Sequence, residues 1–118
     1  MANTDFRTAL QGANEIEITV TGRRSGRSLT YPVWFALDGD KLYLLPVKGS
    51  ESDWYKNIRK TPTIHLAAKG KTFTTSATPI TDSAKVREVV EKFRDKYGAQ
   101  EVKADYPRPD VAVEVSLE

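Results

Sequence analysis

Two short segments of the chain bring glycines, hydroxyl groups and cations together at a bend. The first contains Arg23, Arg24, Ser25 and Gly26, and the second contains Lys48, Gly49 and Ser50. Successive backbone N–H groups in a glycine-containing turn form a concavity that attracts anions, and arginine adds a planar fork of donors suited to phosphate oxygens. The two segments therefore predict two halves of one anion site. For the first segment, a basic hairpin tip without a ligand is the alternative.

Two tryptophans and an asparagine stand close to these turns in the sequence. Residues 52–60 are predicted to form a short helix, whose N-terminus offers free N–H groups and partial positive charge to a phosphate. Trp54 and Asn57 share one face of that helix. Trp34 is predicted to point away from the apolar face of its strand, beside Pro32, either under a helix or into a pocket. A flat ring packed on these side chains is one interpretation; a capped helix with Trp54 as a core anchor is the other.

The remaining residues exclude several kinds of chemistry. The chain has no cysteine and a single histidine, His65, so disulfides, thiolate sites and sites built on two histidines are excluded. Nucleophile-elbow, GxGxxG and P-loop motifs are absent from the sequence. We therefore predict no metal ligands. Proton donors stay open among Tyr31, Tyr55, Tyr97 and Tyr106.

Length and composition predict one folded domain, 1–118. The chain is 39% hydrophobic and 29% charged, which is enough for a modest core and too apolar for a disordered segment. Its net charge of +2 is too small for a polybasic nucleic-acid-binding protein, so an anion site must come from local clustering. Residues 1–10 lack the apolar run of a signal peptide, and no segment approaches the roughly 20 apolar residues of a membrane span. We expect a cytoplasmic protein.

Alternating apolar residues predict six strands. Their ranges are 14–21, 29–37, 41–47, 63–68, 72–80 and 111–117. An apolar stripe over 83–97, ended by Gly98, predicts one long late helix. Six short, mostly antiparallel strands with short helices and one long late helix indicate a mainly β, α+β fold closed into a small barrel.

The order of these motifs resembles the deazaflavin-dependent nitroreductase family. The segments that carry the resemblance are Thr19–Gly26, Tyr31–Pro32, Asp38–Asp40, Lys48–Ser50, Trp54–Asn57 and Pro62. The resemblance covers residues 15–68 well and the remainder loosely. The sequence departs from the pattern at Leu29, where many members carry a basic residue.

The resemblance implies a six-stranded antiparallel split β-barrel, the fold of pyridoxamine-phosphate-oxidase-like flavin proteins. It also implies the deazaflavin cofactor F420, with FMN as the alternative. In the family, the phosphate-bearing tail of the cofactor binds at the two turns and the ring or ribityl chain lies near the short helix. The cofactor-binding residues so implied are Arg23, Arg24, Ser25, Gly26, Lys48, Gly49, Ser50, Trp54 and Asn57, with Pro32 and Trp34 beside them.

The function we expect is hydride transfer from bound reduced F420 or flavin to a small electron-poor acceptor, namely a quinone, an enone or a nitro compound. The alternative is a non-catalytic protein that holds F420, FMN, haem or a lipid in the same groove. In both cases the partner is a small molecule and not a nucleic acid. Split-barrel proteins often bind cofactor between subunits, while the nitroreductase branch includes monomers, so a homodimer and a monomer both stay open.

Overall fold

The computed structural model describes residues 4–107 and 109–117. The N-terminal segment for which we expect no signal peptide includes residues 1–3, which lie outside this part. The strands are β1 (Ile16–Thr21), β2 (Ser28–Val33), β3 (Ala36–Asp38), β4 (Lys41–Leu44), β5 (Thr63–Ala68), β6 (Lys71–Ile80) and β7 (Ala112–Ser116). The helices are α1 (Thr4–Leu10), the 3-10 turn η1 (Gly49–Glu51), α2 (Asp53–Lys60), α3 (Ser83–Tyr97) and α4 (Ala99–Asp105).

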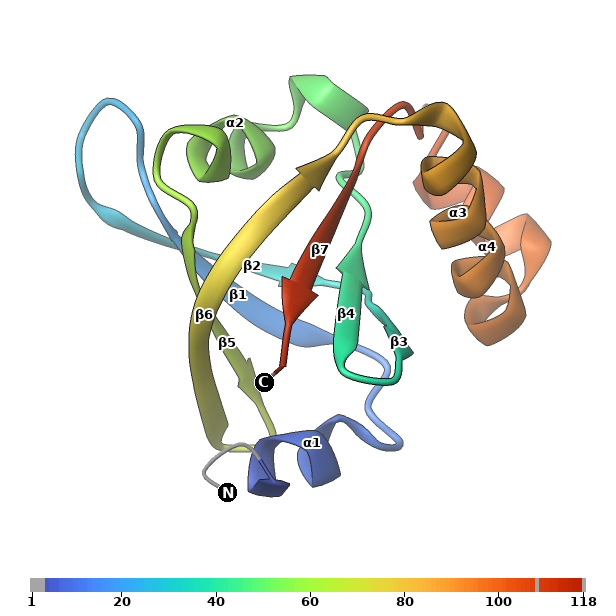
Figure 1. Cartoon of the computed structure of the whole chain (residues 1–118), viewed down its shortest axis with the longest axis horizontal. Coiled ribbons are helices and arrows are strands. Elements are labelled where there is room, and N and C mark those ends of the chain that lie inside the picture. The colour runs from blue at the N-terminus through green and yellow to red at the C-terminus, as the bar shows by residue number, and fades with distance from the viewer. Residues whose placement is uncertain (1–3, 108, 118) are drawn as a thin grey trace.

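The described strands form one curled antiparallel sheet of seven strands, in the order β2-β1-β5-β6-β7-β4-β3 (Figure 1). The predicted class, mainly β with short helices and one long late helix, is confirmed, but the count of six strands is wrong. The segment 29–37 makes two strands, because its first part pairs with β1 up to Val33 and its second part, from Ala36, pairs with β4 at the opposite end of the sheet. Apolar alternation continues through the crossing at Trp34 and Phe35, which is why it predicted one strand.

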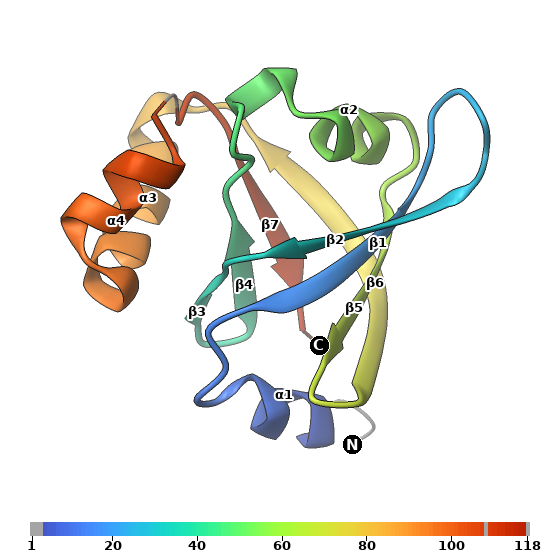
Figure 2. The same cartoon turned by 180° about the vertical axis from the view of Figure 1, so that it is seen from behind.

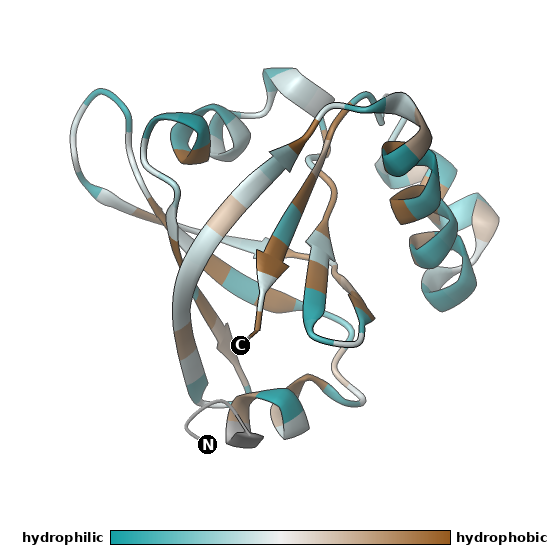
Figure 3. Cartoon of the chain, viewed as in Figure 1, coloured by the Kyte–Doolittle hydropathy of each residue, from teal (hydrophilic) through white to brown (hydrophobic). Residues whose placement is uncertain are grey.

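The long strand β6 gives the sheet its curl. Its first part, residues 71–76, pairs with β5, and its second part, residues 77–80, pairs with β7. The alternation of β1 places Ile16, Ile18 and Val20 on the concave side, where all three are buried. Figure 3 shows the same exchange of apolar and polar residues along β4 and β7. The curled sheet therefore encloses an apolar core.

A second core lies outside the curl, between the sheet and the late helices. Tyr43 and Leu45 from the sheet side meet Val89 and Phe93 of α3 in this cluster, and Val102 of α4 joins them. The main core inside the sheet is closed at one end by α1 and at the other by α2 (Figures 1 and 2). The helices α3 and α4 thus pack on the side of the curled sheet and do not cover the end beside α2.

The long late helix begins and ends where the sequence predicts. Asp82 occupies its N-cap and accepts a hydrogen bond from the Lys85 amide at 3.0 Å. Gly98 ends it with φ at 99°, a conformation that favours glycine. The helix α4 that follows was not predicted. None of the helices in the described part of the chain is long and apolar enough to cross a membrane.

Candidate functional site

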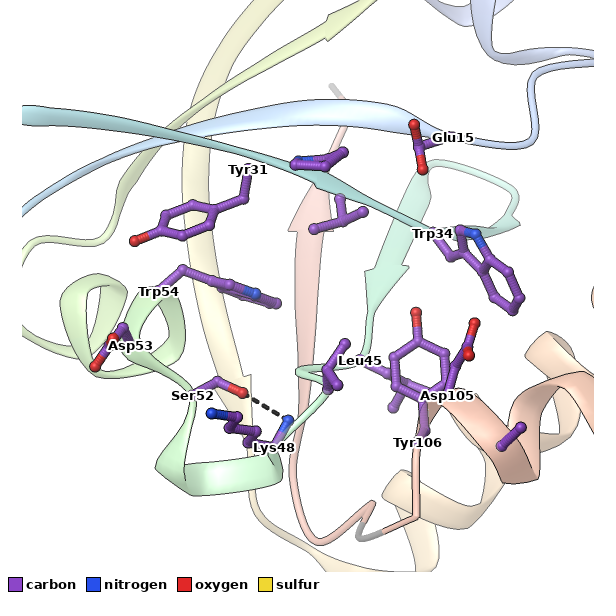
Figure 4. Close-up of a pocket in the computed structure, with 14 residues that line it drawn as sticks. Glu15, Tyr31, Trp34, Leu45, Lys48, Ser52, Asp53, Trp54, Asp105 and Tyr106 are labelled. Atoms are coloured by element: carbon purple, nitrogen blue, oxygen red, sulfur yellow. Dashed lines mark hydrogen bonds between the residues drawn. The ribbon is translucent and has the colours of Figure 1, made fainter.

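A cleft of about 540 Å³ opens beside the N-terminus of α2 (Figure 4). Its walls come from the end of β2, the segment after β4, the start of α2 and the end of α4. The lining residues are Glu15, Tyr31, Pro32, Val33, Trp34, Leu45, Val47, Lys48, Ser52, Asp53, Trp54, Ala104, Asp105 and Tyr106. Segments far apart in the sequence therefore meet at one opening.

Four aromatic side chains line the cleft in two groups. Tyr31 and Trp54 lie on one side and Trp34 and Tyr106 on the other, as Figure 4 shows. Trp34 stacks on Tyr97, with ring centroids 4.2 Å apart and planes 13° apart, and meets the Tyr106 ring edge-on at 6.0 Å. This packing fixes Trp34 between the cleft and the helices. The cleft thus has rigid, flat, apolar walls that suit a planar ligand.

The end of the cleft beside α2 carries a cation and an uncapped helix. Ser52 occupies the N-cap position of α2, but its hydroxyl accepts a hydrogen bond from the Lys48 amide at 2.9 Å and does not cap the helix. The first-turn amides of α2 therefore lack a side-chain cap, and such amides attract anions. The Lys48 ammonium forms no ion pair with any residue that the structure describes. Together these groups make an electropositive corner.

The backbone of the second predicted turn is engaged within the protein. Gly49 is buried, with φ at 58°, and its amide donates to the Pro46 carbonyl at 3.0 Å. The amide and hydroxyl of Ser50 donate to the carboxylate of Asp110 at 3.0 and 2.7 Å. These two bonds lower the pKa of Asp110. Of the three residues of this turn, only Lys48 lines the cleft and brings a charge to it, while Gly49 and Ser50 stabilise the loop.

The first predicted turn is the tip of the β1–β2 hairpin, which projects beyond the sheet beside α2 (Figures 1 and 2). Arg23 is fixed there, because its amide and its Nη1 both donate to the side-chain oxygen of Asn57, at 3.1 and 2.8 Å. Its Nη2 also lies 3.5 Å from the Asp53 carboxylate. Lys60 completes the contact by donating to the Arg23 carbonyl at 2.8 Å. Arg23 and Asn57 therefore join the hairpin to α2.

The rest of the hairpin tip is closed on itself. The Gly22 and Gly26 amides donate to the carbonyls of Arg27 and Gly22, and the Ser25 hydroxyl accepts from the Arg27 amide at 3.1 Å. These amides are consequently not directed at a ligand. The side chains of Arg24 and Arg27 are exposed and form no ion pair within the described ranges. Any anion attracted to the tip would meet these two guanidinium groups.

The predicted site residues thus fall into three places. Pro32, Trp34, Lys48 and Trp54 line the cleft. Arg23 and Asn57 lie next to it, through Asp53, while Arg24, Ser25 and Gly26 lie on the hairpin tip and Gly49 and Ser50 behind Lys48. The structure adds residues that the sequence did not assign to the site, among them Glu15, Leu45, Val47 and Asp105.

The four tyrosines left open as proton donors separate by position. Tyr31 and Tyr106 line the cleft, whereas Tyr55 and Tyr97 do not. Burial raises the pKa of Tyr106 well above its ordinary value, so this phenol stays protonated at neutral pH. Tyr97 is held by the Asn14 and Phe35 carbonyls, at 2.8 and 3.1 Å. These bonds join α3 to the segments that precede β1 and β3.

The described part of the chain has a mainly β, α+β fold with a curled antiparallel sheet, and solved structures share this fold. The family model of the F420H(2)-dependent quinone reductases matches residues 2–118, and the chain belongs to this family. The family confirms the predicted resemblance and F420 as the cofactor. A comparison with curated protein sequences found no match.

Three solved structures illustrate the range of proteins with this fold. An F420-H2 dependent reductase, FDR-A, is 18% identical, with 87% of this chain and 94% of that chain covered and a TM-score of 0.68. A structure described as a domain-swapped dimer is also 18% identical, with 95% and 93% covered and a TM-score of 0.67. The haem-storage protein HutZ from Vibrio cholerae is 12% identical, with 97% and 88% covered and a TM-score of 0.72. Identities this low show a shared fold alone.

Proposed function

We propose that this chain is an F420H2-dependent reductase that transfers a hydride to a small, flat, electron-poor acceptor, such as a quinone, an enone or a nitro compound. Family membership supplies the cofactor. The cleft supports the proposal, because its aromatic walls suit a planar ring and its Lys48 end suits an anionic tail. In this proposal the curled sheet is a split barrel, and the cleft lies at the split beside β2.

Each part of the cleft has a task in this proposal. When bound, F420H2 supplies the hydride. Lys48 and the first-turn amides of α2 hold the phosphate of the cofactor tail, and Trp34 and Trp54 pack on either side of the deazaflavin ring. The exposed guanidinium groups of Arg24 and Arg27 extend the positive charge along the hairpin. The aromatic walls also keep bulk water from the reacting atoms.

Reduction of a quinone or an enone requires a proton besides the hydride. Tyr31 and Tyr106 are the tyrosines that line the cleft. Because Tyr31 is half-buried and borders solvent, it can be reprotonated from water, whereas Tyr106 is buried. We therefore assign the proton to Tyr31, with Tyr106 as a wall of the acceptor site.

The proposal is tested by turnover under anaerobic conditions. F420H2 is mixed with menadione, with and without the protein, and its oxidation is followed by the absorbance of F420. We expect the protein to accelerate the oxidation, and the acceleration to fall in Lys48→Ala at subsaturating cofactor. A protein that binds F420H2 and leaves the rate unchanged would instead be a carrier.

The alternative of a haem-binding protein is favoured by the fold shared with HutZ. The residues of the cleft argue against haem binding. The single histidine of the chain, His65, lies on β5 outside the cleft and forms a hydrogen bond with the Thr74 hydroxyl at 2.8 Å. The cleft thus offers no imidazole to a haem iron. A haemin titration that leaves the Soret band of free haemin unchanged would reject the haem-binding alternative.

Homodimer formation completes the proposal, and it is supported by the relative described as a domain-swapped dimer. Light scattering coupled to gel filtration gives the mass directly. A mass of twice 13.2 kDa is expected, and a mass of 13.2 kDa at micromolar concentration would assign the complete cleft to one chain.

A further inference from the structure

The end of the cleft opposite Lys48 carries two carboxylates, Glu15 and Asp105. We infer that these two side chains make the cleft select neutral or cationic acceptors over anionic ones. The inference rests on the proposed function, because it concerns the acceptor that enters the same cleft. It names a property of the acceptor that family membership leaves open.

Both carboxylates stand beside the aromatic pair at that end. Ile16 pairs with Val33 in the β1–β2 ladder, so Glu15, one residue earlier, adjoins Trp34. Asp105 is the last residue of α4 and precedes Tyr106. Figure 4 shows the two acidic side chains near Trp34 and Tyr106, on the far side of the cleft from Lys48. An acceptor lying against these two rings is therefore close to both charges.

Neither charge is paired with a cation among the residues that the structure describes. Glu15 and Asp105 take part in no ion pair within residues 4–107 and 109–117, and both are exposed at the rim. Their fields reach the tyrosines of this end. Burial is the largest cause of the raised pKa values of Tyr97 and Tyr106, and the charges of Glu15 and Asp105 add to it, respectively.

The Lys48 end has the opposite character. Asp53 also lines the cleft there, but its carboxylate faces the Arg23 guanidinium at 3.5 Å, which offsets its charge. The ammonium of Lys48 and the uncapped amides of α2 remain as the net attraction for anions. The potential therefore changes sign along the cleft, from positive beside α2 to negative beside α4. An anionic cofactor tail fits the first end, and a neutral or cationic acceptor fits the second.

The expected size follows from Coulomb's law in water-like surroundings. A unit charge about 6 Å from an exposed carboxylate changes an equilibrium constant by roughly threefold. Two carboxylates then disfavour an anionic acceptor by about tenfold relative to a neutral one of the same shape. Because both groups are exposed, raising the salt from about 0.05 to 0.5 M should remove most of this preference.

The experiment compares 1,4-naphthoquinone with its 2-sulfonate as acceptors for F420H2. The measured quantity is the ratio of the two kcat/KM values, taken for the wild type, Glu15→Gln, Asp105→Asn and the double variant. Comparing each variant with the wild type cancels the different intrinsic reactivity of the two quinones. Glu101→Gln is the matched control, because Glu101 is exposed on α4, one turn before Asp105, and does not line the cleft.

A second readout needs no turnover. Both quinones are titrated against the oxidised F420 complex and followed by tryptophan fluorescence, and the ratio of their dissociation constants is compared across the same variants. We expect each single variant to shift both ratios about threefold toward the sulfonate and the double variant about tenfold, at low salt only. Glu101→Gln should shift neither.

Ratios that Glu15→Gln and Asp105→Asn leave unchanged would overturn the inference. A shift that persists undiminished at 0.5 M salt would overturn it as well, since an exposed charge is screened there. The proposed function fails on a different result, the absence of F420H2 oxidation with either quinone. In that case the dissociation constants still decide whether the charges select the ligand.

Discussion

The joint between the β1–β2 hairpin and α2 gives a prediction whose size follows from the structure. Asn57 is 2% exposed, and its side-chain oxygen accepts from the amide and the guanidinium of Arg23. Replacing it in Asn57→Ala removes one neutral hydrogen bond, worth about 0.5–1.5 kcal/mol, and one from a charged donor, worth about 1.5–3 kcal/mol. We expect a loss of about 2–4 kcal/mol in the free energy of unfolding.

The assay is urea unfolding followed by tryptophan fluorescence, with thermal unfolding as a second measurement. At about 4 °C per kcal/mol for a chain of this size, the midpoint should fall by about 8–16 °C. Arg24→Ala is the control, because Arg24 is exposed beside Arg23 and should change stability by less than about 0.5 kcal/mol. Arg23→Ala combined with Asn57→Ala should show a coupling of about 1–3 kcal/mol.

Two results would refute this reasoning. The first is an Asn57→Ala variant within about 0.5 kcal/mol of the wild type, because the two bonds then contribute nothing net. The second is a normal stability with a large loss of F420 affinity, which would make Asn57 a cofactor contact rather than a joint. The experiment thus separates the joint that the structure shows from the cofactor contact that the resemblance implies for Asn57.

Two predictions concern pH. Burial lowers the pKa of Lys96 to about 8, so between there and the ordinary lysine pKa of about 10.4 the unfolded chain holds more protons than the folded one. The free energy of unfolding contributed by this group therefore rises with pH over that window. From pH 8 to 10 the free energy of unfolding of the wild type should therefore increase relative to that of Lys96→Met. A difference that stays constant over this range would contradict the burial of Lys96. Hydrogen bonds from Ser50 lower the pKa of Asp110, so its contribution is present above the unfolded value of about 3.9 and lost on further acidification. Urea unfolding at pH 6 and pH 3 should show Asp110→Asn losing less stability to acid than the wild type, and equal losses would argue against the Ser50 contact.

Much of the fold is predictable because its patterns are local. The strand 63–68 and the helix 83–97 are found with the predicted bounds, since alternation and a capped apolar stripe are written in consecutive residues. The crossing at Trp34 and Phe35 is not local, because it depends on which strand each half joins. The helix α4 is short and buries only Val102, so its sequence has no apolar stripe that predicts a helix. Gly98 therefore predicted that helical structure ends there.

The site was predictable only in part for a similar reason. Trp34, Lys48 and Trp54 stood out because their types and the adjacent turns suggested a ligand, and they line the cleft. Glu15 and Asp105 lie 90 positions apart in the sequence, and only the fold brings the end of α4 and the residue before β1 to the same cleft. The spacing of Val102 and Tyr106, both buried and one turn apart, is the one signal in the sequence that could have found the α4 wall.

The measurement that tests the central claim most directly is a titration of the protein with F420 and, separately, with FMN. Quenching of tryptophan fluorescence reports the ligand, because Trp34 and Trp54 both line the cleft. We predict micromolar or tighter binding of F420, weaker binding of FMN, and a loss of about 1.5–3 kcal/mol for F420 in Lys48→Ala. That loss is about 10- to 150-fold in affinity, and the exposed Lys71→Ala should show none. Absence of F420 binding, or binding that Lys48→Ala leaves unchanged, would contradict the assignment of the cofactor to this cleft.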